Sequence, residues 1–194
     1  ERTDGIGIVT REQAIDLGLT GPGLRACGVG HDLRRANPYL VYSNLDFDVP
    51  VYEGGDALAR YYVRMAEMRE SVKIIHQVLE KMPAGEVHAF KPKKVLPRKE
   101  RVYTKMEELI HDFMLVNFGV APPVGEIYSA VEAPKGELGF YIHSSGEGYP
   151  WRMKIRSPSF VNLQSLPTMI MGCMISDVVA IIGGLDPVMG EADK

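Results

Sequence analysis

The most regular pattern in the chain is a run of apolar positions three or four residues apart, between Leu58 and Met82. This spacing puts the apolar side chains on one face of an α-helix. Asp56 stands where a helix N-cap is expected, and Pro83 followed by Gly85 ends the pattern. The predicted helix would be about 39 Å long at ~1.5 Å per residue, so we expect it to pack along a larger body.

The segment before this helix is rich in glycine and more irregular. Thr10 and Gln13 form a capping-box pair ahead of a short predicted helix that stops at Gly18. Gly21-Pro22-Gly23 has the composition of a turn. Residues 32–50 alternate irregularly and contain two prolines, so we expect loops with short extended pieces.

Three further helices are predicted after the long one. A second capping-box pair, Thr104 with Glu107, begins a helix that ends at Gly119. Near the end of the chain, short helices are expected over 160–166 and 168–182. The last of these is hydrophobic along its length, and we expect it to be buried.

Between these helices the apolar period changes from three or four to two. Two segments, Ile127–Glu132 and Leu138–His143, flank the turn-forming sequence Ala133-Pro134-Lys135-Gly136 and predict a hairpin. Trp151–Arg156 alternates apolar and cationic residues strictly, which predicts a half-buried third strand with a cationic outer face. Short connections make the three strands antiparallel. The predicted fold class is α+β, with long helices and a small antiparallel sheet.

We expect a single region over 1–194 with four consecutive parts. Residues 1–55 form the glycine-rich and loop segment, 56–119 hold two helices, 126–156 form the sheet, and 157–194 contain the last helices and the tail. Inside the second part, the basic and proline-interrupted stretch 87–101 is expected to be a linker or an exposed loop.

Composition excludes several classes of protein. A net charge of −3 argues against nucleic-acid binding, which requires a basic surface. No segment approaches the ~20 apolar residues of a membrane span, and Val178–Ile182 is expected to be core. Cys27 and Cys173 lie far apart, so neither a zinc nor an iron–sulfur site is predicted, and the pattern suits a reducing compartment.

Common catalytic motifs are also absent. The sequence has no GxGxxG fingerprint after a strand, no P-loop, no GxSxG elbow and no pair of histidines at helical ligand spacing. His76 and His111 fall within predicted helices and are read as ordinary surface or hydrogen-bonded residues. The cationic residues Arg152, Lys154 and Arg156 either face solvent or provide a docking surface.

Two polar segments are candidates for a functional site. In the segment 132–137, two carboxylates and Lys135 gather around a proline turn, which is either a solvated turn or the wall of a site. Asp186-Pro187 follows the hydrophobic helix directly, and a buried carboxylate there needs a charged partner or holds a proton. Chain ends often fray, so this tail is either a site or an unstructured end.

These two segments resemble the quinone-site subunit of proton-pumping NADH:quinone oxidoreductases, the respiratory complex I family. The resemblance runs along the whole chain, is consistent with a chain that starts at Glu1, and assigns it to the C-terminal half of the family's longer polypeptide. The segments that carry it are Asp32-Leu33-Arg34-Arg35, Pro38-Tyr39, Val41-Tyr42, Phe47-Asp48-Val49-Pro50, Arg64–Ser71, Glu132–Tyr141, Ser157–Leu163 and Leu185–Lys194.

The family is related to the large subunit of nickel–iron hydrogenases, and the resemblance implies that fold. In hydrogenases the matching tail carries a Cys-x-x-Cys that holds the metal. Here Asp186-Pro187 is retained, but Val188 and Met189 follow and no cysteine is present. Nickel would lack its soft thiolate ligands, so no metal and no hydrogenase activity are expected.

The resemblance implies a subunit of a membrane-associated NADH:quinone oxidoreductase. It would help to form the quinone-reduction chamber beside the terminal iron–sulfur cluster and to couple electron transfer to proton translocation. FMN and the iron–sulfur clusters are expected in partner subunits, so the chain alone would bind no cofactor and be inactive. Its expected location is peripheral, on the cytoplasmic side of the cell membrane or the equivalent organelle membrane, with membrane contact only through partner subunits.

Three residues are carried over to the expected quinone chamber by motif. Asp186 and Val188 would line the chamber, and Lys135 would stand near its wall. Asp186 would tune or relay protons, because two-electron reduction of a quinone to a quinol consumes two protons. The His and Tyr that hold the headgroup in the family belong to the half outside this chain.

The sequence departs from the family pattern at a few positions, which leaves the electron donor and the quinone type open. One alternative is a related complex fed by ferredoxin or another donor, and another is a non-catalytic docking module. The departures are His143-Ser144-Ser145-Gly146, Trp151, Asp112, Met171 and Lys194.

Overall fold

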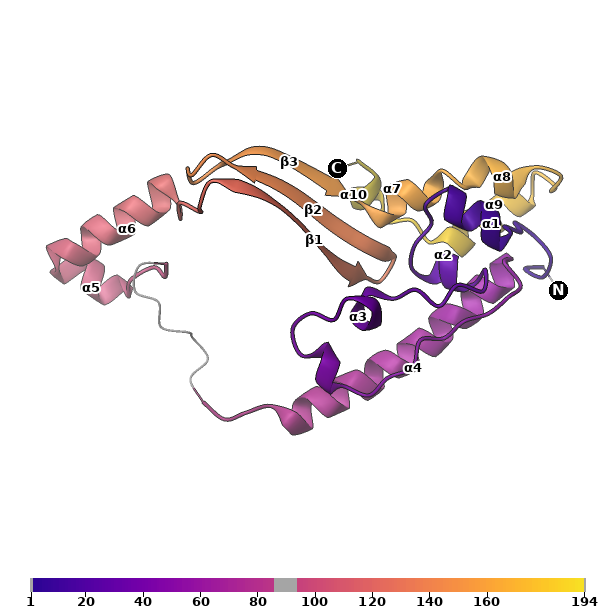
Figure 1. Cartoon of the computed structure of the whole chain (residues 1–194), viewed down its shortest axis with the longest axis horizontal. Coiled ribbons are helices and arrows are strands. Elements are labelled where there is room, and N and C mark those ends of the chain that lie inside the picture. Colours follow the sequence, from indigo (N-terminus) through magenta and orange to yellow (C-terminus); the bar gives the residue numbers. More distant parts are fainter. Residues whose placement is uncertain (1, 86–93, 194) are drawn as a thin grey trace. The chain divides into compact units, whose positions relative to one another are not determined.

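The computed structural model describes residues 2–85 and 94–193 and divides into two compact units. The first unit comprises Glu1–Met82, Ser129–Gly139 and Ile155–Lys194, and the second comprises Pro83–Tyr128 and Phe140–Lys154. Figure 1 shows the elements in chain order, helices with one three-stranded antiparallel sheet. The α+β fold class predicted from the sequence is therefore confirmed.

The glycine-rich start of the first unit forms two short helices. Helix α1 (Arg11–Asp16) has the predicted capping box, with the Gln13 amide N–H donating to Thr10 Oγ1 at 3.3 Å. The predicted turn at Gly21-Pro22-Gly23 is instead the start of helix α2 (Pro22–Arg25). Proline fits the first position of a helix because its missing N–H would have no partner there. Gly21 precedes it with φ 70°, a value that favours glycine.

The loops predicted over 32–50 also contain two helical turns, while Asp32 and Leu45 beside these turns have the extended backbone that was predicted. Helix α3 (Leu33–Ala36) is capped by Asp32, whose Oδ1 accepts a hydrogen bond from the Arg34 amide at 2.9 Å. The 3₁₀ helix η1 (Tyr42–Asn44) follows. Both turns contain too few residues to give a periodic signal, so the sequence pattern predicted neither of them.

Helix α4 (Ala57–Lys81) confirms the strongest prediction. Asp56 Oδ1 accepts a hydrogen bond from the Ala59 amide at 2.7 Å, which is the expected N-cap. Burial is confined to the first two turns, where Ala57, Ala59, Arg60 and Val63 lie. Most of the other large apolar side chains of α4 are exposed in the structure as described, some of them already in these first turns. The exposed residues are Tyr61, Tyr62, Met68, Val72, Ile75 and Leu79.

The main core of the first unit joins the start of the chain to its last helices. Helix α9 (Asp177–Leu185) packs against α4, α7 (Pro158–Leu163) and α8 (Leu166–Ile170), and α10 (Met189–Asp193) packs against α7. Each large aliphatic side chain buried here contributes about 1.5–3 kcal/mol. The buried core residues are Val9, Ala14, Leu19, Leu24, Cys27, Met169, Ile181 and Leu185.

The helix predicted over 168–182 is not continuous. Helix α8 ends at Ile170 and α9 begins at Asp177, with Gly172 between them at φ 83°. The left-handed backbone at a glycine ends the helical hydrogen bonding although the apolar pattern continues. Nor is α9 buried all round, because Ile181 is inaccessible while Val179 is 77% exposed.

The second unit contains helices α5 (Lys99–Thr104) and α6 (Met106–Phe118), which pack on each other. The predicted capping box at Thr104 is wrong, because Thr104 lies in α5 and its hydroxyl donates to the Glu100 carbonyl at 2.8 Å. Part of the predicted linker over 87–101 lies outside the described residues, and from Lys99 onward it is helical.

The sheet has the strand order β1-β2-β3, formed by β1 (Gly125–Ala133), β2 (Gly136–Ser144) and β3 (Pro150–Arg156). The predicted hairpin is confirmed, with its turn at Pro134-Lys135. The half-buried third strand is not, because Trp151 is 77% and Met153 51% exposed. A strand buries its apolar side only where a second layer covers it, and of the three apolar residues on this side only Ile155, near the end of the strand, is half-buried.

Within residues 2–85 and 94–193, no helix combines the length and the apolar character needed to cross a membrane.

Candidate functional site

The hairpin turn and the tail, the two polar segments singled out in the sequence, meet in the first unit. The Lys135 ammonium group on the β1–β2 turn forms an ion pair with Asp186 Oδ2, at the C-terminal end of α9. Lys135 is 19% exposed and Asp186 48% exposed at the side chain. The expectation that Asp186 is buried is therefore wrong, while its need for a charged partner is met.

Asp186 has an unusual backbone conformation. Its φ of 52° and ψ of 55° are left-handed, and Asp and Asn adopt this region more readily than most other non-glycine residues. Arg64 from α4 stabilises this end of α9, because its two terminal nitrogens donate to the carbonyls of Gly184 at 2.7 Å and Leu185 at 3.0 Å. Burial lowers the pKa of Arg64, with Asp186 opposing the shift.

Lys135 and Asp186 both line a cavity of about 600 Å³ in the first unit. Val188, the third residue expected here, does not line this cavity and is 41% exposed. The walls come from α4, from the hairpin turn and from the segments around α2, α3 and η1. The lining residues are Arg25, Arg34, Tyr42, Tyr61, Arg64, Met65, Glu67, Met68, Ser71, Glu132, Ala133, Pro134, Lys135 and Asp186.

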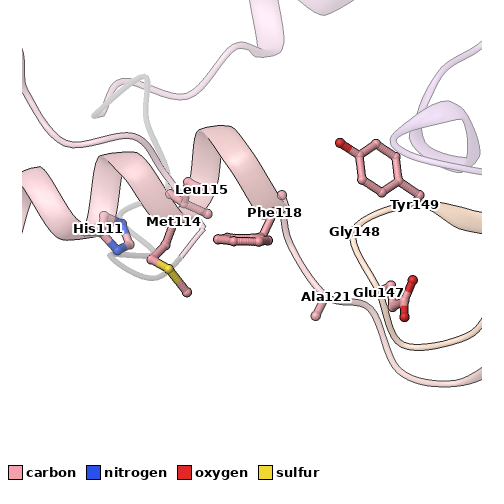
Figure 2. A pocket seen from close by; sticks show the side chains of 9 residues that line it. His111, Met114, Leu115, Phe118, Ala121, Glu147, Gly148 and Tyr149 are labelled. Atoms are coloured by element: carbon pink, nitrogen blue, oxygen red, sulfur yellow. The ribbon is translucent and has the colours of Figure 1, made fainter.

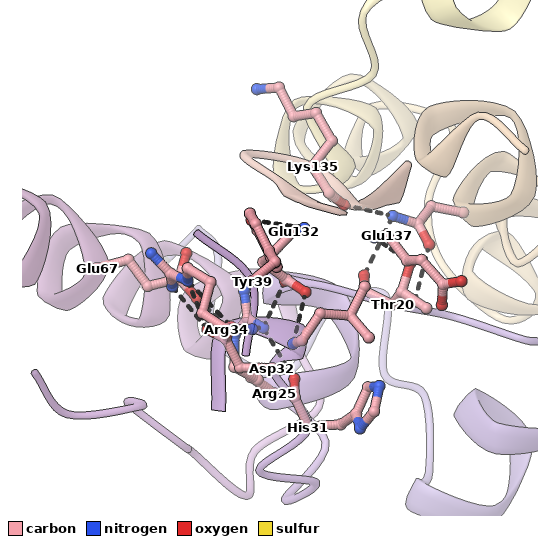
Figure 3. A network of polar contacts seen from close by, with 12 residues as sticks. Thr20, Arg25, His31, Asp32, Arg34, Tyr39, Glu67, Glu132, Lys135 and Glu137 are labelled. Carbon is pink, nitrogen blue, oxygen red and sulfur yellow. Dashed lines mark hydrogen bonds and ion pairs between the residues drawn. The ribbon is translucent and has the colours of Figure 1, made fainter. Parts of the chain in front are cut away.

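A buried arginine on α2 connects three of these walls, as Figure 3 shows. Arg25 Nε donates to Glu67 Oε1 on α4 at 2.6 Å, and its Nη1 donates to Glu132 Oε1 on β1 at 2.8 Å. Burial alone lowers the pKa of Arg25, but the two carboxylates outweigh it and raise that pKa above its ordinary value. Arg25 therefore stays charged and joins α2, α4 and the hairpin.

Asp32 and Arg34 form a second ion pair beside the first. Arg34 Nη2 donates to Asp32 Oδ2 at 2.6 Å, and Asp32 is 1% exposed at the side chain. Burial by itself would raise the pKa of Asp32, but the hydrogen bonds and charge of Arg34 lower it below its ordinary value. Glu132 Oε2 also accepts a hydrogen bond from the Leu33 amide at 3.2 Å, so α3 is tied to β1 as well.

The hairpin turn is held from its other side by close backbone packing. The Asn162 side-chain amide on α7 donates to the Lys135 carbonyl at 3.0 Å, and its oxygen accepts from the Thr20 amide at 3.2 Å. A Cβ on Gly136 would lie 2.5 Å from Thr20 Oγ1, and a Cβ on Gly21 would lie 2.5 Å from the Gly136 Cα. Only glycine allows the two segments to approach this closely.

Sequence reasoning identified Lys135 and Asp186 but missed Arg25, Arg64 and Glu67 as members of one site. A signal for the α4 residues exists, since Arg60, Arg64 and Glu67 recur at helical spacing beside the apolar stripe. No local pattern marks Arg25, because the two carboxylates that it hydrogen-bonds, Glu67 and Glu132, are 42 and 107 positions away in the sequence.

A second cavity, of about 740 Å³, lies in the second unit and is shown in Figure 2. Its walls are the end of α6 and the connection between β2 and β3. It is mainly apolar, with Met114, Leu115 and Phe118 on the helix and Tyr149 on the connection.

Metal-ligating side chains do not gather anywhere in the described part of the chain in a group of three or more. Cys27 is buried and Cys173 half-buried, and both are free thiols.

Comparison with known proteins places the whole chain in one family. The family model described as "Respiratory-chain NADH dehydrogenase, 49 Kd subunit" matches residues 1–194. The chain is 61% identical over 194 residues to a D-type subunit of the NADH-quinone oxidoreductase of Chloroherpeton thalassium, covering 100% of this chain and 44% of that protein.

Two other relatives give the same result. The D-type subunit of the NADH-quinone oxidoreductase of Methylacidiphilum infernorum is 56% identical over 194 residues, and the one from Salinibacter ruber is 54% identical over 195 residues. All of this chain is covered in both, against 46% and 43% of the relatives, so the chain spans somewhat less than half their length. The chain thus belongs to the family of the 49-kDa subunit of respiratory-chain NADH dehydrogenase, which has the hydrogenase large-subunit-like fold.

Proposed function

We propose that this chain forms part of the quinone-reduction chamber of an NADH-quinone oxidoreductase, with Lys135 and Asp186 in its wall. The observation that carries the proposal is the ion pair between these two residues in one cavity. They lie 51 positions apart in the sequence, and each belongs to a segment that resembles the family's quinone site. Relatives over the full chain are named as subunits of this enzyme, which supports the same assignment.

The chemistry of the cavity suits an uncharged ligand with polar edges. Most of the charged groups on its walls are already paired with one another. A charged ligand would have to displace one member of such a pair, and the displaced charge would be left without a partner at a large cost. Tyr61, Met65 and Met68 supply apolar and aromatic surface beside them. A quinone headgroup has two carbonyl acceptors on a flat apolar ring and matches this mixture.

Asp186 and Lys135 have complementary roles in the proposal. Reduction of a quinone to a quinol adds two electrons and two protons, so a group near the carbonyl oxygens must hold or move protons. The half-exposed Asp186 carboxylate can exchange a proton with water, and the Lys135 ammonium group stabilises negative charge on a reduced carbonyl oxygen. Val188 does not line this cavity, so its place in an apolar chamber wall stays a prediction.

Electrons would reach this chamber from outside the chain. In this proposal FMN and the iron–sulfur clusters belong to partner subunits, and the subunit with the terminal cluster is the neighbour at the chamber. The complex couples quinone reduction to proton translocation. The chain is peripheral, on the cytoplasmic side of the cell membrane or the equivalent organelle membrane, and partner subunits make the membrane contact.

The test uses the assembled complex with Lys135→Ala or Asp186→Asn. We expect both variants to assemble, to reduce quinone at least roughly tenfold more slowly, and to lose affinity for a quinone-site inhibitor, because each removes a charge from the chamber wall. Electron transfer from NADH to an artificial acceptor such as ferricyanide should stay normal, since that reaction bypasses the quinone.

The matched control is the exposed ion pair of Lys73 with Asp46, at 3.3 Å on the surface of the same unit. Lys73→Ala and Asp46→Asn remove the same chemical groups outside the cavity and should leave quinone reduction unchanged. Normal quinone reduction and inhibitor affinity in both Lys135→Ala and Asp186→Asn would refute the proposal and favour a docking role for this surface.

A further inference from the structure

The segment from Asp186 to Val188 has a defined shape although it lies near the end of the chain. A left-handed backbone at a residue other than glycine costs about 1–3 kcal/mol and persists only where the surroundings hold it. On the upstream side, Arg64 holds the carbonyls of Gly184 and Leu185. On the downstream side Pro187 has no N–H to donate. The first backbone donor after Asp186 is therefore the amide of Val188.

Ser159, at the start of α7, provides this downstream hold. Its side-chain oxygen accepts a hydrogen bond from the Val188 amide at 3.2 Å. Its hydroxyl donates to Glu191 Oε2 at 2.5 Å, and its own amide donates to the same oxygen at 3.2 Å. Because the single hydroxyl proton points to Glu191, a lone pair remains for the Val188 amide. Ser159 is 2% exposed, so water does not compete for these bonds.

The backbone of Glu191 is in turn bound to the start of α7. The Ser157 hydroxyl donates to the Glu191 carbonyl, and α10 packs on α7. A hydrogen bond to a carboxylate is about twice as strong as one between neutral groups. Ser159 and Glu191 thus bind each other and, through Val188, fix the backbone that follows Asp186.

We propose that Ser159 and Glu191 are positioning residues that hold the Asp186–Val188 segment in place and so direct the Asp186 carboxylate toward Lys135. They touch neither a ligand nor the Lys135–Asp186 pair, and they act through the backbone of Val188. This inference rests on the proposed function, since it assigns to the two residues the geometry of the proposed quinone chamber wall.

The experiment compares assembled complexes that carry Ser159→Ala, Ser159→Thr or Glu191→Gln. It measures KM and kcat for a short-tailed ubiquinone analogue, and deuterium uptake at the amides of 186–192. In Ser159→Ala we expect amide exchange at Val188 to speed up and KM to rise by roughly tenfold, because Asp186 is no longer held. Ser159→Thr keeps the hydroxyl and should restore both values to near those of the unmodified complex.

Glu191→Gln keeps an acceptor oxygen without the charge, so we expect an intermediate rise in KM of roughly threefold. This milder variant, with Ser159→Thr, keeps the test decisive if Ser159→Ala does not assemble. Ser165→Ala is the matched control, because it removes a fully buried serine hydroxyl that bonds only within its own segment. It should change neither KM nor the exchange at Val188.

The outcomes distinguish a failure of the positioning inference from a failure of the proposed function. If Asp186→Asn impairs quinone reduction but Ser159→Ala and Glu191→Gln leave KM and Val188 exchange unchanged, the positioning inference is overturned while the proposed function stands. If Asp186→Asn and Lys135→Ala have no effect either, the proposed function fails first. A rise in KM in Ser165→Ala equal to that in Ser159→Ala would also overturn the inference, because general weakening of the core would then explain both.

Discussion

Glu132 on β1 accepts a hydrogen bond from Arg25 on α2 at 2.8 Å, across 107 residues of sequence. Both side chains are almost fully buried, with exposures of 4% and 2%. The same arginine also binds Glu67 on α4. One guanidinium group thus joins three elements that form the walls of the candidate site.

Replacement of this arginine should be costly. Arg25→Ala leaves the carboxylates of Glu67 and Glu132 buried without their partner, and removal of one member of a buried ion pair costs about 3–5 kcal/mol. Arg25→Lys keeps the charge, but an ammonium group cannot reproduce the fixed fork by which the guanidinium donates to Glu67 and Glu132 at once. It should therefore recover only part of that loss. The check is the free energy of unfolding in urea, for the protein with each substitution. A loss below about 1 kcal/mol in Arg25→Ala would contradict the central role given to this residue.

The Asp32–Arg34 pair should make the free energy of unfolding depend on pH in the acid range. The pKa of Asp32 is lower in the folded protein than in the unfolded chain, where it is about 3.9. Its carboxylate therefore stabilises the fold above about pH 4, and this contribution is lost as the pH falls through the folded pKa. The stability difference between the unmodified protein and Asp32→Asn should be largest near neutral pH and shrink on acidification. Urea midpoints between about pH 7 and pH 3 measure it, with Asp46→Asn as a control for net charge.

Two glycines of the first unit should respond in opposite ways to alanine. Gly136 has φ 137°, and alanine there would place its methyl group 2.5 Å from Thr20 Oγ1. Gly136→Ala should therefore separate the hairpin from the segment just before α2 and destabilise the protein by at least about 2 kcal/mol. Gly183 lies inside α9 with open space around it, and alanine there should be neutral or stabilise by up to about 1 kcal/mol. Thermal unfolding of the two variants compares them directly. Equal destabilisation would contradict the close approach.

The left-handed backbone of Asp186 can be tested apart from its charge. Asp186→Asn and Asp186→Val both remove the carboxylate, but Asn tolerates φ near 52° and β-branched Val does not. We expect the Val variant to be less stable than the Asn variant by about 1–3 kcal/mol. Limited proteolysis of the tail should show the same order. Equal behaviour would mean that the tail relaxes into an ordinary conformation.

The exposed apolar surface of α6 should make the isolated chain associate with itself. Several large apolar side chains are exposed together on this helix, such as Ile110 at 55% and Phe113 at 58% exposure. A contiguous apolar patch of this kind is larger than most monomeric proteins expose to water. Ile110→Lys with Phe113→Lys should lower the apparent mass in light scattering. Asn117→Lys places a charge on the same helix without removing apolar surface, and should leave the mass unchanged. A monomeric unmodified chain would contradict this expectation.

Local signals predicted the elements whose causes are local. The Asp56 cap and the apolar period of α4, the capping box of α1, and the turn at Pro134-Lys135 were all visible in the sequence and all are present. The failures occur where a local pattern had two structural solutions. Thr104 could begin one helix or end another, and the apolar run over 168–182 continues through the break at Gly172.

The site was predictable only in part for the same reason. The charges at Lys135 and Asp186 stood out because each follows a clear structural signal, a turn in one case and an apolar helix in the other. Arg25 gave no signal, because its role depends on partners on α4 and β1. Burial of α4 and β3 could not be deduced either, since an apolar stripe shows which face can be covered and not what covers it.

The paired backbone contacts of Thr20 and Asn162 also carry a consequence for biosynthesis. These residues are 142 positions apart, so the two hydrogen bonds between them, and the one from Asn162 to the Lys135 carbonyl, form only after Asn162 has been synthesised. At a synthesis rate of about 5–20 residues per second, the first segment waits roughly 7–30 s on the ribosome for this partner. During that interval the core residues around α1 and α2 lack their neighbours from the last helices, Met169, Ile181 and Leu185. The segment around α1 and α2 should therefore depend on chaperones during that interval, and it should resist protease only after α7, α8 and α9 have emerged.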